Sequence, residues 1–177
     1  YLQHSLQDDR PLPGIYLNDE GQLSLLQQFN YNAELLAFRY SIEEQKNKYF
    51  YNNGMFCQGD GEILYSMVRH FKPQRIIEVG SGYSTLMSLQ AIAANKKEQA
   101  VYNCELTCIE PYEISWLETL DIKLNRIPVE KIEPGYFQQL EENDILFIDS
   151  SHMIRPQGDV LFEFLQVLPA LKKGVII

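Results

Sequence analysis

A short run of β-branched residues that ends in two closely spaced glycines constrains the fold of this 177-residue chain more than any other stretch. The run comprises Ile76, Ile77 and Val79. Gly80 and Gly82 follow it, and apolar residues then recur at helical spacing, which predicts a buried strand, a tight turn and a helix. Glycine has no Cβ, so such a turn can bring backbone N–H groups against a ligand. A turn that needs glycine for steric reasons alone gives the same pattern, and both interpretations stay open.

A second apolar run ends at Glu110, 28 residues beyond Gly82. That distance suits one helix and a return strand, so both residues are expected at the same edge of a parallel sheet. A carboxylate at this edge can accept hydrogen bonds from both hydroxyls of a ribose. The alternative is a solvated acidic residue that closes a strand.

Further strands are expected at 122–127, 145–149 and 174–177, with helices between them. This alternation indicates a doubly wound, Rossmann-like α/β fold with a mostly parallel sheet. The fourth run is fully apolar up to Asp149, which should therefore lie at the ligand-binding edge. Pro111 is expected to begin a helix. Another helix should bury an apolar face formed by Val160, Leu161, Phe164, Leu165 and Leu168.

Residues 1–58 are predicted to form an N-terminal helical and aromatic extension, and residues 59–177 the α/β domain. Asn18 and Asp19 are expected helix caps in the extension, and Asp60 is the expected cap of the first helix of the domain. Aromatic residues are dense over 31–56. A packed cap over the edge of the sheet explains them better than a mobile lid, because aromatic side chains usually serve packing.

The composition narrows the possible partners and the compartment. A net charge of −9, from 24 acidic and 15 basic residues, argues against a nucleic-acid partner. The three cysteines do not form a disulfide framework, and free thiols fit a reducing cytoplasm. No apolar stretch approaches the length of a membrane span, so we expect a cytoplasmic protein with no membrane partner.

The sequence Glu78-Val79-Gly80-Ser81-Gly82, followed by Glu110, resembles the glycine motif and ribose-binding acid of class I S-adenosylmethionine-dependent methyltransferases. Residues 82–85 and 147–152 are most similar to a subgroup found in bacterial small-molecule and sugar tailoring, like methyltransferase domain family 24. The resemblance runs from about residue 60 to the last residue. The dinucleotide-binding fingerprint fits less well, because Thr85 occupies its third glycine position.

The resemblance implies that the cofactor is S-adenosylmethionine. Its binding residues would be Glu78, Gly80, Ser81, Gly82 and Glu110, with Glu78 near the methionine part. Val129, at the exit of the third strand, would lie beside the adenine, where it either contacts the ring or belongs to the core.

Residues 149–152 resemble the motif of metal-dependent O-methyltransferases such as the catechol type, in which an Asp binds magnesium and a Lys three residues later acts as base. Asp149 matches the metal ligand, and His152 stands where the Lys would be. Imidazole can take a proton from a hydroxyl group, so His152 and Asp149 are the candidate catalytic residues. Because one carboxylate holds Mg²⁺ poorly, a magnesium requirement is left open.

The expected function is therefore O-methylation of a small hydroxylated or sugar-like acceptor. The alternatives are a dinucleotide-dependent oxidoreductase on the same sheet and a non-catalytic, methyltransferase-like binding module. The family's sheet normally continues for two more strands, whereas this chain stops within the fifth. We expect a C-terminally truncated domain, a partly ordered chain, or a homodimer that covers the open edge.

Overall fold

The computed structural model describes residues 14–41 and 47–177, so residues 1–13 and 42–46 of the predicted extension lie outside the description. The chain divides into two compact units, residues 1–30 and 31–177. The first contains α1 (Asp19–Gln28). Asn18 holds the predicted N-cap position but makes no side-chain capping bond, and Asp19 is the first residue of the helix rather than a cap. The division into an extension of residues 1–58 and a domain of residues 59–177 stays a prediction.

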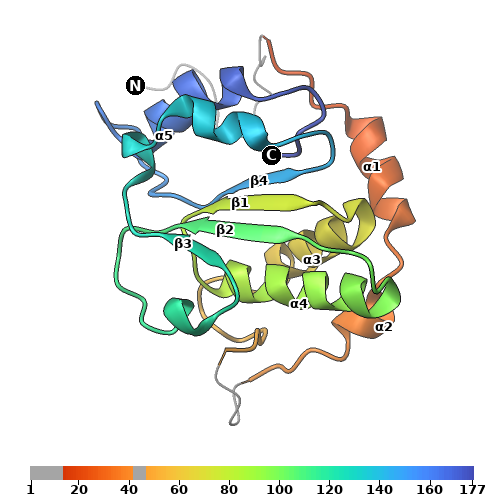
Figure 1. Ribbon diagram of the computed structural model, residues 1–177. Coiled ribbons are helices and arrows are strands. Elements are labelled where there is room, and N and C mark those ends of the chain that lie inside the picture. Colours follow the sequence, from red (N-terminus) through yellow and green to blue (C-terminus); the bar gives the residue numbers. More distant parts are fainter. Residues whose placement is uncertain (1–13, 42–46) are drawn as a thin grey trace, which may run out of the picture. The chain divides into compact units, whose positions relative to one another are not determined.

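Four parallel strands form the sheet of the second unit, in the order β3-β2-β1-β4 (Figure 1). They are β1 (Arg75–Val79), β2 (Glu105–Ile109), β3 (Lys123–Asn125) and β4 (Ile145–Ile148). Val79 pairs with both Ile109 and Ile148, so the residues that follow these three strands meet at one edge. The predicted Rossmann-like α/β fold is confirmed.

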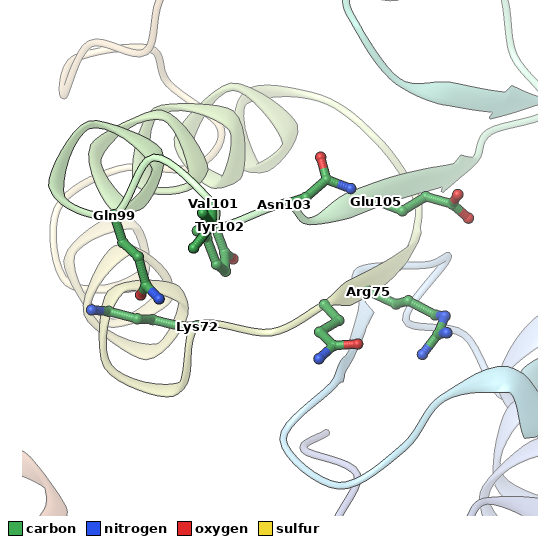
Figure 2. A pocket seen from close by; sticks show the side chains of 8 residues that line it. Lys72, Arg75, Gln99, Val101, Tyr102, Asn103 and Glu105 are labelled. Carbon is green, nitrogen blue, oxygen red and sulfur yellow. The ribbon is translucent and has the colours of Figure 1, made fainter.

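A hollow of about 570 Å³ lies at the opposite edge, around the amino ends of β1 and β2 (Figure 2). Its lining is polar, and the charged groups in it already have partners. Lys72 pairs with Glu98 at 3.1 Å, and Arg75 pairs with Asp144 at 3.2 Å. The hollow lies at the amino ends of the strands, whereas the predicted site residues lie at their carboxyl ends.

Helices cover both faces of the sheet because alternate strand residues point to opposite sides. On one face, α3 (Asp60–Phe71) and α4 (Tyr83–Glu98) pack on the side that carries Ile76. The other face carries Ile77 and is covered by short helices (Figure 1). These are Val129–Lys131, Pro134–Gln139, α5 (Asp159–Phe162), Glu163–Val167 and Leu168–Ala170.

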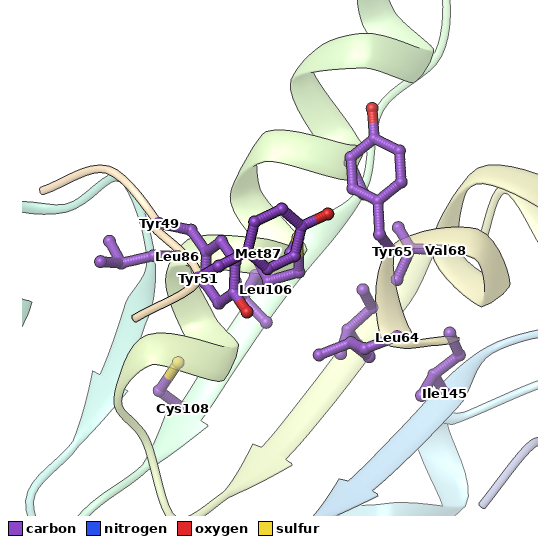
Figure 3. Close-up of a cluster of buried hydrophobic side chains, with 12 residues drawn as sticks. Tyr49, Tyr51, Leu64, Tyr65, Val68, Leu86, Met87, Leu106, Cys108 and Ile145 are labelled. Atoms are coloured by element: carbon purple, nitrogen blue, oxygen red, sulfur yellow. The ribbon is translucent and has the colours of Figure 1, made fainter. Parts of the chain in front are cut away.

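Aromatic residues of the 31–56 segment belong to the core on the face covered by α3 and α4. Tyr49 and Tyr51 are buried among residues of α3, α4 and the sheet (Figure 3). Phe38 meets Tyr49, Tyr51 and Tyr65 edge to face, with ring centroids 5.1 to 6.1 Å apart. These contacts fasten the segment to α3 by apolar packing.

A buried arginine joins the same segment to both helices. Arg69, on α3, binds both carboxylate oxygens of Glu34, at 2.9 and 3.0 Å, and Glu34 belongs to α2 (Asn32–Leu35). The guanidinium also donates to Asn95 and to Glu98, both on α4. The bond from Arg69 is the main reason why the pKa of Glu34 lies below its ordinary value. Removing Glu34 would leave the buried Arg69 charge without its main partner, whereas Glu34 itself is partly exposed.

Three predicted elements differ in the structure. The helix expected at Pro111 is wrong: the chain forms a loop and a single 3-10 turn at Leu117–Thr119, because Arg126 occupies carbonyl groups of the loop. The fifth strand is reduced to one parallel bridge between Ile145 and Ile176. The first helix of the domain is capped by Gly59 rather than Asp60.

The apolar face predicted for the last helix is also wrong in part. α5 continues as a π-helix over Glu163–Val167, whose wider turn brings residues five apart onto one side. Phe162 and Val167 are buried as a result, whereas Phe164 is 59 % and Leu165 is 68 % exposed. A pattern read at 3.6 residues per turn does not anticipate this rotation.

No helix in the described parts of the chain has the length and apolarity that a membrane crossing requires.

The turn after β1 packs directly against the residue that follows β4. Gly80 has φ +81°, and a Cβ added there would stand 1.9 Å from the backbone oxygen of Asp149. Backbone hydrogen bonds fix this approach, since Gly80 donates to Ile109 at 3.0 Å and Asp149 donates to Val79 at 2.8 Å. Only glycine fits this position without moving one of the two segments.

Gly80→Ala should therefore lower the free energy of unfolding by at least about 2 kcal/mol, from the left-handed backbone and the overlap with Asp149 together. Gly82→Ala is the matched control, because a Cβ at Gly82 meets nothing within 4 Å; it should change stability by less than about 1 kcal/mol. Urea unfolding followed by the fluorescence of the single tryptophan, Trp116, measures both. Equal stability of the two variants would contradict the close approach.

Candidate functional site

The site is built where β1, β2 and β4 end, and its first part is the turn before α4. Gly82 has an extended φ of 179°, and its N–H donates to the Thr85 hydroxyl at 3.0 Å. Because nothing lies within 4 Å of the position of a Cβ there, packing within the described chain does not require glycine. The space beside Gly82 is open to a ligand.

Glu110 joins the glycine turn to the loop after β2. Its carboxylate accepts the Ser81 N–H at 3.0 Å on one oxygen and the Tyr112 N–H at 2.8 Å on the other. The residue is only 6 % exposed, so these bonds offset the cost of burying the charge. Each carboxylate oxygen has a further lone pair, which leaves Glu110 able to accept hydroxyl groups of a ligand.

The hydroxyl of Ser81 is buried and has no hydrogen-bond partner among the described residues. Such groups are rare in folded proteins, because an unmet hydrogen bond costs free energy. The hydroxyl belongs to the same residue whose N–H meets Glu110. A polar ligand group at the turn would satisfy it.

Glu78 lies beneath the turn and is fully buried. The Ser84 hydroxyl donates to its Oε1 at 2.5 Å, and the Cys108 thiol donates to its Oε2 at 3.5 Å. Burial raises the pKa of Glu78 to about 7, although the bonds from Ser84, Thr85 and Cys108 oppose the rise. These contacts make Glu78 an internal support of the turn, and its contact with the methionine part of a cofactor stays a prediction.

The structure brings Asp149 and His152 together in the loop after β4. The His152 Nε2 lies 2.9 Å from the Asp149 Oδ1, and His152 is exposed. The two serines between them bind acidic residues four positions apart in the last helix. Ser150 donates to Glu163 at 3.0 Å, and the Ser151 hydroxyl donates to Asp159 at 2.7 Å. The two serines thus fasten the loop to the last helix, while the imidazole of His152 is exposed to solvent.

No group of three or more His, Cys, Asp or Glu side chains that could hold a metal ion occurs within residues 14–41 and 47–177. The predicted Mg²⁺ at Asp149 therefore has no support in the geometry of the described side chains. Val129 is buried in the apolar cluster that contains Ile109. Its contact with adenine stays a prediction.

Two features of this edge were not singled out in the sequence. Tyr83, the first residue of α4, lies between Phe50 and Trp116, with ring centroids 5.4 and 6.1 Å away. Arg126 follows β3 and reaches the loop after β2. The available signal for Arg126 was a charged residue late in the predicted strand 122–127, near the edge where ligands bind.

Comparison with known proteins identifies a family for this arrangement. A family model described as "Methyltransferase domain" matches residues 77–177. The chain is 32% identical over 148 residues to an uncharacterized protein of Archaeoglobus fulgidus, an alignment that covers 79% of this chain and 64% of that protein. The chain thus spans less than two thirds of the length of this relative. No solved structure matches the chain.

The raised pKa of Glu78 predicts a specific pH dependence of stability. Between its ordinary value of 4.5 and about 7, the folded chain holds a proton that the unfolded chain has lost. Raising the pH through this interval therefore lowers the free energy of unfolding. Glu78→Gln removes the ionisation, so the stability of the variant relative to the unaltered chain should rise by about 2 to 3 kcal/mol from pH 5 to pH 8. Urea unfolding at four pH values measures it, and a difference that does not vary with pH would contradict the assignment.

Proposed function

The chain belongs to the methyltransferase domain family, and we propose that it transfers a methyl group from S-adenosylmethionine to a hydroxyl oxygen of a small hydroxylated or sugar-like acceptor. The observation that carries this proposal is the open space at Gly82 beside the buried Glu110 carboxylate. A bare backbone and a ribose-binding acid at one edge of a parallel sheet suit an adenosine cofactor.

The residues present fit such a cofactor. Glu110 would accept the ribose hydroxyls with its remaining lone pairs, while Ser81 and Tyr112 hold its carboxylate in place. The unpaired Ser81 hydroxyl would gain a polar partner, and Gly82 would let the ligand approach the backbone. When bound, S-adenosylmethionine supplies an electrophilic methyl group on a positively charged sulfur.

Asp149 and His152 support acceptance of the methyl group by a hydroxyl oxygen. Asp149 accepts a hydrogen bond from the His152 ring at 2.9 Å when Nε2 carries the proton, which orients the imidazole. The other ring nitrogen, Nδ1, is then the acceptor that can take the proton of the hydroxyl group. Holding the acceptor in line with the methyl group is the larger part of catalysis in such a displacement.

The charge of the chain favours a small acceptor over a nucleic acid. A net charge of −9 gives no surplus of basic residues for phosphate contacts.

Calorimetric titration with S-adenosylhomocysteine tests the cofactor site without an acceptor. We expect micromolar binding that Glu110→Ala weakens by at least about tenfold, because hydrogen bonds to a charged group contribute about 1.5 to 3 kcal/mol. Glu113→Ala is the matched control, since this glutamate lies exposed on the same loop, and it should bind as the unaltered chain does.

Melting temperatures without ligand confirm that each variant is folded. Unchanged affinity in a folded Glu110→Ala variant would refute the ribose assignment. Binding of a nicotinamide dinucleotide in place of S-adenosylhomocysteine would instead establish the oxidoreductase alternative.

A further inference from the structure

Arg126 stands beside Glu110 at the cofactor edge, although the two residues are far apart in sequence. Ile109 pairs with Asn125 in the sheet, so the residues that follow, Glu110 and Arg126, leave neighbouring strands at the same level. The Glu110 N–H also donates to the Asn125 carbonyl at 3.0 Å. The side chain of Arg126 is therefore placed at the start of the loop after β2.

The guanidinium of Arg126 binds this loop at several points. Nη1 donates to the carbonyl of Glu110 at 3.3 Å and to that of Tyr112. Nη2 donates to the carbonyl of Ile114 at 3.2 Å and to the Glu118 carboxylate at 2.8 Å. The guanidinium thus holds three carbonyl groups at two-residue intervals along the loop.

Tyr112 transmits this constraint to the Glu110 carboxylate. Its N–H donates to Glu110 Oε1 at 2.8 Å, and its carbonyl accepts from Arg126. The peptide groups on either side of Tyr112 therefore connect the guanidinium with the carboxylate. If Arg126 released the carbonyl, the Tyr112 N–H would lose the position from which it orients Glu110.

We propose that Arg126 is a positioning residue for the cofactor, which sets the loop 110–116 so that the Glu110 carboxylate faces the ribose. This inference rests on the proposed function, because the orientation of Glu110 matters only if a nucleoside binds there. The planar guanidinium suits the role, since its donors form a fixed fork that an ammonium group does not reproduce. The two terminal nitrogens make all the hydrogen bonds from Arg126 to the loop. The Nε is buried and has no hydrogen-bond partner among the described residues.

Arg126→Lys tests the inference because it keeps the positive charge but removes the planar set of guanidinium donors. Titrations with S-adenosylhomocysteine and with 5′-methylthioadenosine, which lacks the amino acid part, compare the two portions of the cofactor. We expect both ligands to bind about tenfold more weakly, by the same factor, because the defect lies at the ribose. Arg75→Lys is the matched control, since Arg75 pairs with Asp144 at the opposite edge, and it should leave both affinities unchanged.

Two further measurements separate positioning from a general effect on stability. Adding millimolar guanidinium to Arg126→Ala should recover part of the lost affinity, which a merely destabilised protein would not show. Glu118→Gln removes the ion pair but leaves the carbonyl bonds, so it should bind both ligands normally.

The outcomes decide the inference. Normal binding by folded Arg126→Lys would overturn it, and so would a loss in Glu118→Gln equal to that in Arg126→Lys. If the unaltered chain binds neither ligand, the proposed function fails and this inference fails with it. If the unaltered chain binds, Glu110→Ala weakens binding and the Arg126 variants bind normally, the proposed function stands and the positioning role does not.

Discussion

The approach of the glycine turn to the end of β4 is the constraint on which the rest of this structure depends. The backbone oxygen of Asp149 occupies the place where a side chain on Gly80 would begin. This contact locks the exits of β1 and β4 together, and the pairing of Val79 with Ile109 brings in the exit of β2. One short contact thereby aligns the turn, the acid at Glu110 and the loop with His152. The two glycines serve different purposes. Gly80 is required by its close contact with Asp149, whereas Gly82 leaves open space beside the backbone for a ligand.

The fold class was predictable because its signals are local. Apolar runs that end in Gly, Glu or Asp identify buried parallel strands whose polar ends share an edge. The errors arose where distant groups override local preference. Pro111 begins no helix, because a guanidinium from beyond β3 takes the carbonyls of the loop. Phe164 in the last helix faces solvent because the α-helix becomes a π-helix at Glu163.

The positions of the candidate site residues were predictable from the sequence, but their contacts with one another were not. The sequence places Gly82, Glu110 and Asp149 at strand ends, and His152 is near Asp149 simply because it is three residues away. Contacts between separate loops are not encoded in such spacing. The bond from Ser81 to Glu110 and the bonds from Arg126 depend on register and loop shape, which emerge only when the strands pair. The same is true of Glu78, whose burial against Ser84 and Cys108 no local pattern reveals.

The cooperative folding unit is longer than the part of the chain that the family model matches. Arg69 and the aromatic residues around Phe38 extend it toward the amino terminus. The family match begins at residue 77, within β1, yet Tyr49 and Tyr51 complete the core, and Glu34 neutralises a buried guanidinium. Inherited changes at Glu34, Phe38, Tyr49 or Tyr51 would therefore lower the amount of folded protein. Substitution of these four residues is thus limited by the quality control of folding in the cell.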